Sequence, residues 1–167
     1  STVTSWTRAG ELEAYENMVD KFAGQNQIFA CVIDSYDDLR ATREISDPNG
    51  PICQLLKEKG GIFVLRPDSG DPVVTIPKML AILEDNVGST TNDKGYKVLN
   101  NFRIIWGDGI NRTTISTILR VAVDVMGYSA DNFAFGMGGA LLQGHTRDTF
   151  KFAMKASAIK VNGEWRD

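Results

Sequence analysis

The fold is indicated above all by one stretch, Gly61-Ile62-Phe63-Val64-Leu65-Arg66-Pro67-Asp68-Ser69-Gly70, in which an apolar run stops at charged residues and glycine. The same arrangement recurs along the chain, with apolar runs over residues 28–33, 61–65, 102–106 and 132–135. Short runs rich in Ile, Val and Phe are typical of strands buried on both faces. Because barrels and open α/β sheets place their active sites at the carboxyl ends of such strands, the polar clusters predict a site there.

Amphipathic helices are predicted between these strands. Apolar residues recur at helical spacing within residues 12–22, 52–56, 76–83 and 115–126. The strands begin about 30–40 residues apart, which is the size of a βα unit. A complete barrel of eight such units needs roughly 250 residues. We therefore expect an α/β fold of four βα units, forming roughly half of a TIM-like (β/α) barrel. Residues 1–167 would be a single segment of a longer polypeptide.

Two further stretches carry local expectations. Residues 88–97 contain a run of Ser, Thr, Asn and Asp and are predicted to form an exposed loop before the third strand. Residues 156–161 resemble a strand.

The composition is that of an ordinary globular protein, with 43% hydrophobic and 23% charged residues. A net charge of −3 without a run of Lys or Arg argues against nucleic acid or a membrane as partner. Cys31 and Cys53 lack C-x-x-C spacing and lie among apolar residues, which favours free thiols in a reducing cytoplasm over a disulfide. We therefore expect a cytoplasmic protein. His145 is the only histidine, so this chain alone cannot form a metal site using two histidines or a histidine-based triad.

The sharpest motif follows the second strand. Pro67 biases Arg66 toward extended geometry, so the strand should continue up to the arginine. A guanidinium there would bind phosphate or stack on a flat ring, and Asp68 would accept hydrogen bonds from ribose hydroxyls. The alternative is a local ion pair of Arg66 with Asp68, followed by a helix N-cap.

Two glycine clusters end the later strands. Gly107 would let a ligand approach the backbone while Asp108 presents acceptor oxygens, although a tight turn with an Asx hydrogen bond accounts for the motif equally well. Gly138 and Gly139 resemble the phosphate loops that follow late barrel strands, and Arg147 would add positive charge. Asp34, after the first strand, is placed to face the same site.

Taken together, several motifs along nearly the whole chain closely resemble the nicotinamide phosphoribosyltransferase family. They are Ser1-Thr2-Val3-Thr4-Ser5-Trp6, Asp34-Ser35-Tyr36-Asp37, Leu65-Arg66-Pro67-Asp68-Ser69-Gly70, Lys94-Gly95-Tyr96-Lys97, Gly107-Asp108-Gly109, Ala134-Phe135-Gly136-Met137-Gly138-Gly139, Leu141-Leu142-Gln143 and Thr146-Arg147-Asp148. The resemblance implies a homodimeric pentosyltransferase with an incomplete TIM-like barrel. Such an enzyme makes nicotinamide mononucleotide and diphosphate from nicotinamide and phosphoribosyl pyrophosphate. ATP assists through a phosphorylated histidine, and Mg²⁺ accompanies the diphosphate.

The resemblance also implies roles for single residues. Arg66 and Asp68 would be the catalytic pair, with Arg66 near the pyridine and diphosphate. Asp68 and Asp108 would bind the ribose hydroxyls, with Gly107 admitting the sugar. The remaining implied contacts are the 5′-phosphate with Gly138, Gly139 and Arg147, and the magnesium–diphosphate end with Asp34 and Asp68 through water.

The chain also departs from the family pattern. The phosphorylated histidine would immediately precede Ser1, and neither it nor the preceding half-barrel with its ring-clamping residues is in this sequence. Ala30 and Met137 stand where serine is usual in the family. We therefore expect the isolated chain to be inactive. Two alternatives stay open: a nicotinate-specific relative, or a non-catalytic half-barrel module that requires a partner chain.

Overall fold

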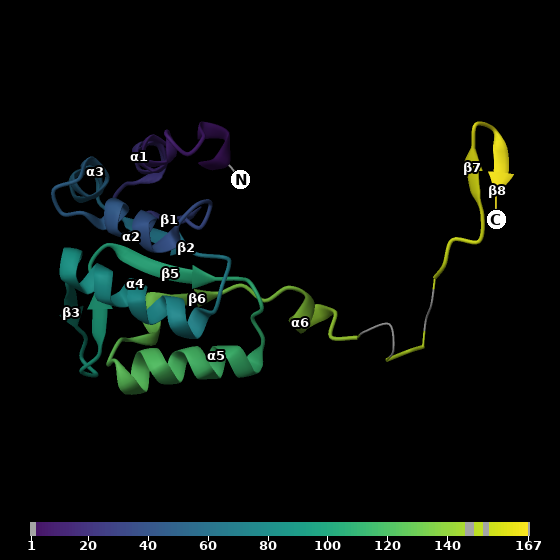
Figure 1. Cartoon of the computed structure of the whole chain (residues 1–167). Coiled ribbons are helices and arrows are strands. Elements are labelled where there is room, and N and C mark those ends of the chain that lie inside the picture. Colours follow the sequence, from purple (N-terminus) through teal and green to yellow (C-terminus); the bar gives the residue numbers. More distant parts are fainter. Residues whose placement is uncertain (1–2, 146–148, 152–153, 167) are drawn as a thin grey trace. The chain divides into compact units, whose positions relative to one another are not determined.

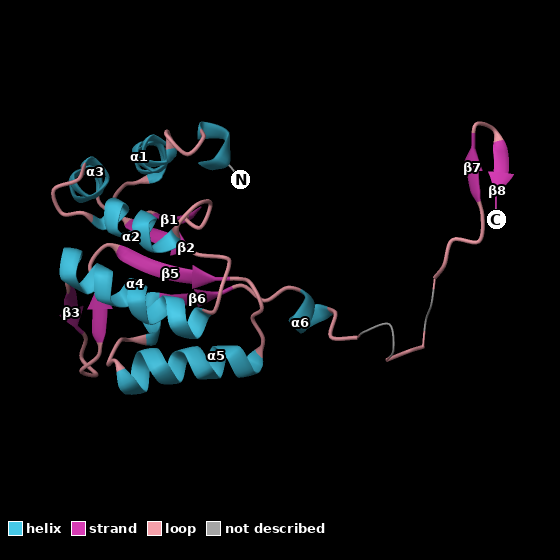
Figure 2. Ribbon diagram, in the orientation of Figure 1, coloured by secondary structure: helices cyan, strands magenta, loops and turns pink. Residues whose placement is uncertain are grey.

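The computed structural model describes residues 3–145, 149–151 and 154–166. The chain divides into two compact units, residues 1–137 and residues 138–167, which are considered separately below. Figures 1 and 2 show the arrangement of helices and strands within each.

The first unit is built on a parallel sheet with the strand order β1-β2-β5-β6. These strands are β1 (Ile28–Val32), β2 (Ile62–Arg66), β5 (Phe102–Trp106) and β6 (Phe133–Phe135). They correspond to the four apolar runs, and β2 continues up to Arg66 as expected from the following proline. The α/β class and the parallel sheet are therefore confirmed, while closure into a barrel stays a prediction.

Several of the connecting helices begin at a capping side chain. Their bounds are α1 (Glu11–Phe22), α2 (Asp38–Ser46), α3 (Pro51–Lys59), α4 (Pro72–Val87) and α5 (Arg112–Leu119), with short 3₁₀ turns η1 (Val3–Trp6) and η3 (Ala130–Asn132). Asp37, Asp71 and Asn111 each accept a hydrogen bond from a main-chain amide in the first turn of the following helix. The α5 helix continues as a π-helical segment, η2 (Arg120–Val125), before Gly127. Helix α2 packs on α4 and α4 on α5, forming a row beside the sheet (Figure 1).

One face of the sheet carries the core. Phe29, Phe63 and Phe102 lie in register on neighbouring strands, with ring centroids 4.8 and 6.1 Å apart. Trp106 and Leu65 are completely buried on the same face. Since side chains alternate along a strand, Arg66 belongs to the opposite face.

The prediction that all four strands are buried on both faces is wrong. Ile28 of β1 is 67% exposed, Ala30 is also exposed, and so is Ala134 of β6. The alternate residues Phe29 and Cys31 are buried. Among the described residues, the helices cover mainly the aromatic face, so β1 is buried on one side only and β6 is partly buried on one side.

The predicted loop at residues 88–97 is also wrong. Strands β3 (Ser89–Thr91) and β4 (Lys97–Leu99) form an antiparallel hairpin there. The side chain of Asn92 closes the turn by accepting hydrogen bonds from the amides of Lys94 and Tyr96. The hairpin could not be recognised in the sequence because its strands are short and show no alternation of apolar and polar residues.

The second unit contains α6 (Gly139–Leu142) and a hairpin of β7 (Ile159–Val161) with β8 (Glu164–Arg166). Asn162 and Gly163 join the two strands with φ values of 50° and 89°. Positive φ at both positions is the geometry of a type I′ hairpin turn, which favours Asn-Gly. The strand predicted at residues 156–161 is thus confirmed over its last three residues.

Candidate functional site

The carboxyl ends of β1, β2, β5 and β6 lie at one edge of the sheet because all four strands are parallel. Main-chain hydrogen bonds between neighbouring strands continue to this edge. The amide of Ile33 donates to the carbonyl of Arg66 at 3.1 Å, and the amide of Gly136 donates to the carbonyl of Trp106 at 2.9 Å. The residues that follow the strands are therefore held close to one another.

Arg66 and Asp68 form the centre of this edge. Arg66 Nη2 donates to Asp68 Oδ2 at 3.0 Å, so the predicted local ion pair is present. Two buried atoms of the pair, Arg66 Nε and Asp68 Oδ1, have no hydrogen-bond partner among the described residues. Buried polar atoms are normally paired, because leaving one unpaired costs about 1–3 kcal/mol. The ion pair therefore contains one unpaired donor and one unpaired acceptor, both buried, at the carboxyl edge of the sheet.

Asp34 joins the first strand end to this pair. Its Oδ2 accepts a hydrogen bond from the amide of Asp68 at 3.1 Å. Asp34 is half-buried, whereas Asp37 in the same loop is exposed and caps α2. The structure thus brings Asp34, Arg66 and Asp68 together, as the sequence predicts.

Gly107, the first residue after β5, lies beside the Arg66–Asp68 pair. A Cβ atom at this position would lie 3.0 Å from Asp68 Oδ1 and 3.2 Å from Arg66 Nη2. Such contacts are tighter than carbon atoms normally make, so a side chain at position 107 would displace the carboxylate or the guanidinium. Gly136 in turn lies beside Gly107, since a Cβ atom at Gly136 would contact the Gly107 Cα at 3.5 Å. Gly107 therefore makes room for the charged pair, a reason that the motif alone did not indicate.

Asp108 lies in the turn that follows β5. Its carbonyl accepts a hydrogen bond from the Trp106 indole at 2.9 Å, and Gly109 has a φ of 62°. The side chain of Asp108 is exposed. Within the described part of the chain, the carboxylate makes no hydrogen bond corresponding to the alternative Asx turn. The turn is thus held by the Trp106 indole through the Asp108 carbonyl, and the exposed carboxylate is available to a ligand.

The remaining predicted phosphate ligands belong to the second unit. Gly138 and Gly139 are exposed, and a Cβ atom at either position would contact nothing within 4 Å. Arg147 lies outside the described residues. Their meeting with the Arg66–Asp68 pair stays a prediction.

The arrangement of acidic side chains determines where a metal ion could bind. Among the residues that the structure describes, no group of three or more His, Cys, Asp or Glu side chains is arranged to hold a metal ion. Asp34 and Asp68 supply two neighbouring carboxylates, which suits Mg²⁺ only when phosphate and water complete its coordination.

Cys31 and Cys53 are free and buried, as predicted. Burial raises the pKa of Cys31 to about 11, which keeps the thiol protonated near neutral pH.

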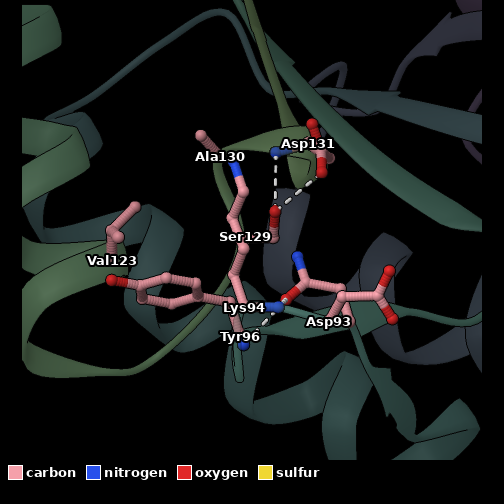
Figure 3. A pocket seen from close by; sticks show the side chains of 8 residues that line it. Asp93, Lys94, Tyr96, Val123, Ser129, Ala130 and Asp131 are labelled. Carbon is pink, nitrogen blue, oxygen red and sulfur yellow. Dashed lines mark hydrogen bonds between the residues drawn. The ribbon is translucent and has the colours of Figure 1, made fainter.

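A separate cavity of about 380 Å³ lies beside the β3–β4 hairpin (Figure 3). Its lining includes Asn92, Lys94 and Tyr96 of the hairpin, and none of the predicted site residues. Ser129, which also lines the cavity, donates a hydrogen bond to Asp131 at 2.8 Å. Sequence reasoning missed this cavity because it treated the hairpin as a loop. The Lys94-Gly95-Tyr96-Lys97 motif was the signal that could have drawn attention to it.

No helix in the described ranges is both long enough and apolar enough to cross a bilayer.

Comparisons with known proteins assign the chain to a family. The model of the nicotinate phosphoribosyltransferase (NAPRTase) family matches residues 1–167. A protein named nicotinamide phosphoribosyltransferase from Xanthomonas campestris pv. campestris is 49% identical over 167 residues, which is 100% of this chain and 35% of that protein. Proteins of the same name from Mycoplasma pneumoniae and Acinetobacter baylyi are 33% and 30% identical, over 95% and 100% of this chain. The chain spans between 35% and 37% of the length of these relatives. The resemblance found in the sequence is thereby confirmed, and the chain belongs to the nicotinate phosphoribosyltransferase family.

Proposed function

We propose that this chain supplies the ribose- and phosphate-binding half of a phosphoribosyltransferase site that acts on nicotinamide. The reaction would join nicotinamide to phosphoribosyl pyrophosphate, giving nicotinamide mononucleotide and diphosphate. The names of the relatives support nicotinamide as the acceptor. The observation that carries the proposal is the Arg66–Asp68 pair, with one buried donor and one buried acceptor unpaired at the carboxyl edge of the sheet.

The chemistry of the transfer fits these groups. The pyridine nitrogen forms a bond to the anomeric carbon of the sugar while the bond from that carbon to the diphosphate oxygen breaks. The electron pair of the broken bond leaves with the diphosphate, and the ribose ring carries positive charge in the transition state. Because no proton must move, placement of charge and orientation of the reactants carry the catalysis.

Each residue then has a defined task. The Asp68 carboxylate accepts hydrogen bonds from the ribose hydroxyls and stabilises the developing positive charge. The Arg66 guanidinium faces the leaving diphosphate or the pyridine ring. Asp108 binds a second ribose hydroxyl from the exposed turn after β5. Gly138, Gly139 and Arg147 hold the 5′-phosphate.

The proposed cofactor and partners follow from the same reaction. Mg²⁺ would be held chiefly by diphosphate, with Asp34 and Asp68 contributing through water, and would neutralise the charge of the leaving group. ATP would assist from outside this segment, and the complete polypeptide would act as a cytoplasmic homodimer. In the parallel sheet, neighbouring strands follow one another in chain order, as they do in a (β/α) barrel. This order supports the proposal of a half-barrel completed by the rest of that polypeptide.

The test uses the complete polypeptide that contains this segment. Phosphoribosyl pyrophosphate is supplied with nicotinamide or with nicotinate, and both the mononucleotide and the diphosphate are quantified. The proposal expects transfer to nicotinamide, whereas preferential transfer to nicotinate would assign the acid as substrate. The isolated 167-residue chain is assayed in parallel and should be inactive. Turnover by that chain on the order of 1 s⁻¹ would contradict the assignment of essential groups outside it.

A further inference from the structure

The turn that carries Asp68 has an unusual main-chain connection. Pro67 has no N–H group, so the amide of Asp68 is the first main-chain donor after Arg66. In a regular parallel pair, an amide at this point would donate to a carbonyl of the neighbouring strand. Here it donates instead to the side chain of Asp34, at 3.1 Å from Oδ2. The carboxylate of Asp34, two residues after the end of β1, therefore takes the place of the next step of the β1–β2 ladder, directly after the bond from Ile33 to the Arg66 carbonyl.

This connection fixes the part of the turn that the ladder no longer holds. Beyond Asp68, both Ser69 and Gly70 are exposed, and Gly70 has a φ of 87°. The next anchor is Asp71, which caps α4 by accepting a hydrogen bond from the amide of Val73 at 2.9 Å. Between β2 and this cap, Asp34 holds the main chain at the residue whose carboxylate faces the site.

We propose that Asp34 is a positioning residue, which holds the amide of Asp68 and thereby fixes the Asp68 carboxylate and its ion pair with Arg66 at the site. The inference rests on the proposed function and deepens it. The Asp34 side chain then has two conceivable roles, holding the Asp68 amide and contacting magnesium through water. An uncharged acceptor is sufficient for the first role, whereas the second depends on negative charge.

Two substitutions in the complete polypeptide distinguish these roles. Asp34→Ala removes the acceptor and the charge, whereas Asp34→Asn removes the charge and retains a carbonyl oxygen of the same reach. Positioning predicts that Asp34→Ala accelerates hydrogen exchange of the Asp68 amide by about tenfold or more, while Asp34→Asn leaves that amide protected. It also predicts that Asp34→Ala lowers kcat more than about tenfold, and that Asp34→Asn recovers most of this loss. Exchange is read at single-residue resolution by mass spectrometry.

The control is Asp37→Ala, a matched change in the same loop. Asp37 caps α2 through the amide of Arg40, so this variant should melt at a lower temperature while exchange at Asp68 stays that of the wild type. Unchanged exchange in Asp34→Ala would overturn the proposal, and so would an Asp34→Asn variant that protects the amide yet is as inactive as Asp34→Ala. Failure of the wild-type polypeptide to transfer phosphoribosyl groups would instead overturn the proposed function, while the exchange measurement would still test the role of Asp34.

Discussion

The turn after β2 and the glycine loop after β6 both follow parallel strands, but their residues are held in different ways. In the first, the Asp68 carboxylate bonds to Arg66, and the Asp68 amide bonds to Asp34. The carboxylate also packs closely against Gly107. In the second, Gly138 and Gly139 are exposed, and a methyl group added at either would contact nothing within 4 Å. The comparison teaches that charged side chains need support from neighbouring strands to stay oriented, whereas an amide loop needs mainly open access for an anion.

The largest effect is expected from Asp68→Asn in the complete polypeptide. The substitution keeps the shape of the side chain and removes the charge that would stabilise the positive ribose. We expect kcat/KM to fall by roughly 30–1000-fold, corresponding to about 2–4 kcal/mol of activation free energy. Steady-state kinetics and thermal unfolding are measured on the same samples. A sharply lower melting temperature with full kcat/KM in the remaining folded enzyme would make Asp68 a structural turn residue.

The next largest effect should come from Gly107→Ala. The added methyl group would lie 3.0 Å from Asp68 Oδ1, and the carboxylate is the movable end of a side chain. We therefore expect about a tenfold loss of kcat/KM with a melting temperature within roughly 2 °C of the wild type. Gly138→Ala is the matched comparison for stability, since its methyl group meets nothing. Normal kinetics in Gly107→Ala would show that the strand ends tolerate a side chain and that the close fit has no consequence.

A smaller and more selective effect is expected from Arg147→Ala, which tests the loop after β6. If Arg147 closes on the 5′-phosphate, the variant should lose about 1.5–3 kcal/mol of binding to nicotinamide mononucleotide. Affinity for the dephosphorylated riboside should stay unchanged, and calorimetry of both ligands gives the answer. Equal losses for the two ligands would remove Arg147 from the phosphate site and leave the glycine loop as a tight turn.

The smallest effect should follow from Asn111→Ala, near the edge of the sheet but outside the charged pair. Asn111 caps α5 through a reciprocal pair of hydrogen bonds with Thr114, so the change should cost about 1 kcal/mol of folding free energy. Denaturant unfolding measures this cost, and kcat/KM should stay that of the wild type. A large loss of activity would mean that the turn containing Asp108 is positioned by the helix cap rather than by β5.

Elements with a local signal could be predicted from the sequence. Periodic apolar residues and capping residues such as Asn111 located the helices, and Pro67 placed Arg66 at the end of β2. The proximity of Arg66 to Asp68 also follows from their spacing. Exposure of Ile28 could not be predicted, because it depends on which elements cover each face of the finished sheet. The β3–β4 hairpin was missed because β3 is polar and both strands are too short to show an apolar period.

Contacts between different strand ends required the structure. Asp34 and Asp68 are 34 residues apart, and their hydrogen bond depends on the parallel register of β1 with β2. The fit of Gly107 against the same carboxylate depends likewise on the register of β2 with β5. A sequence motif therefore identified the candidate ligands, while only the register identified what holds them.

A crystal structure of the complete polypeptide with nicotinamide mononucleotide most directly tests the central claim, that the Arg66–Asp68 pair contacts the phosphoribosyl group. A ribose hydroxyl is expected within about 2.5–3.0 Å of a carboxylate oxygen of Asp68, with a phosphate oxygen or the pyridine ring against the Arg66 guanidinium. The bond from the Asp68 amide to Asp34 should be retained in that complex. A nucleotide bound elsewhere, with Asp68 Oδ1 still unpaired beside Gly107, would contradict the account.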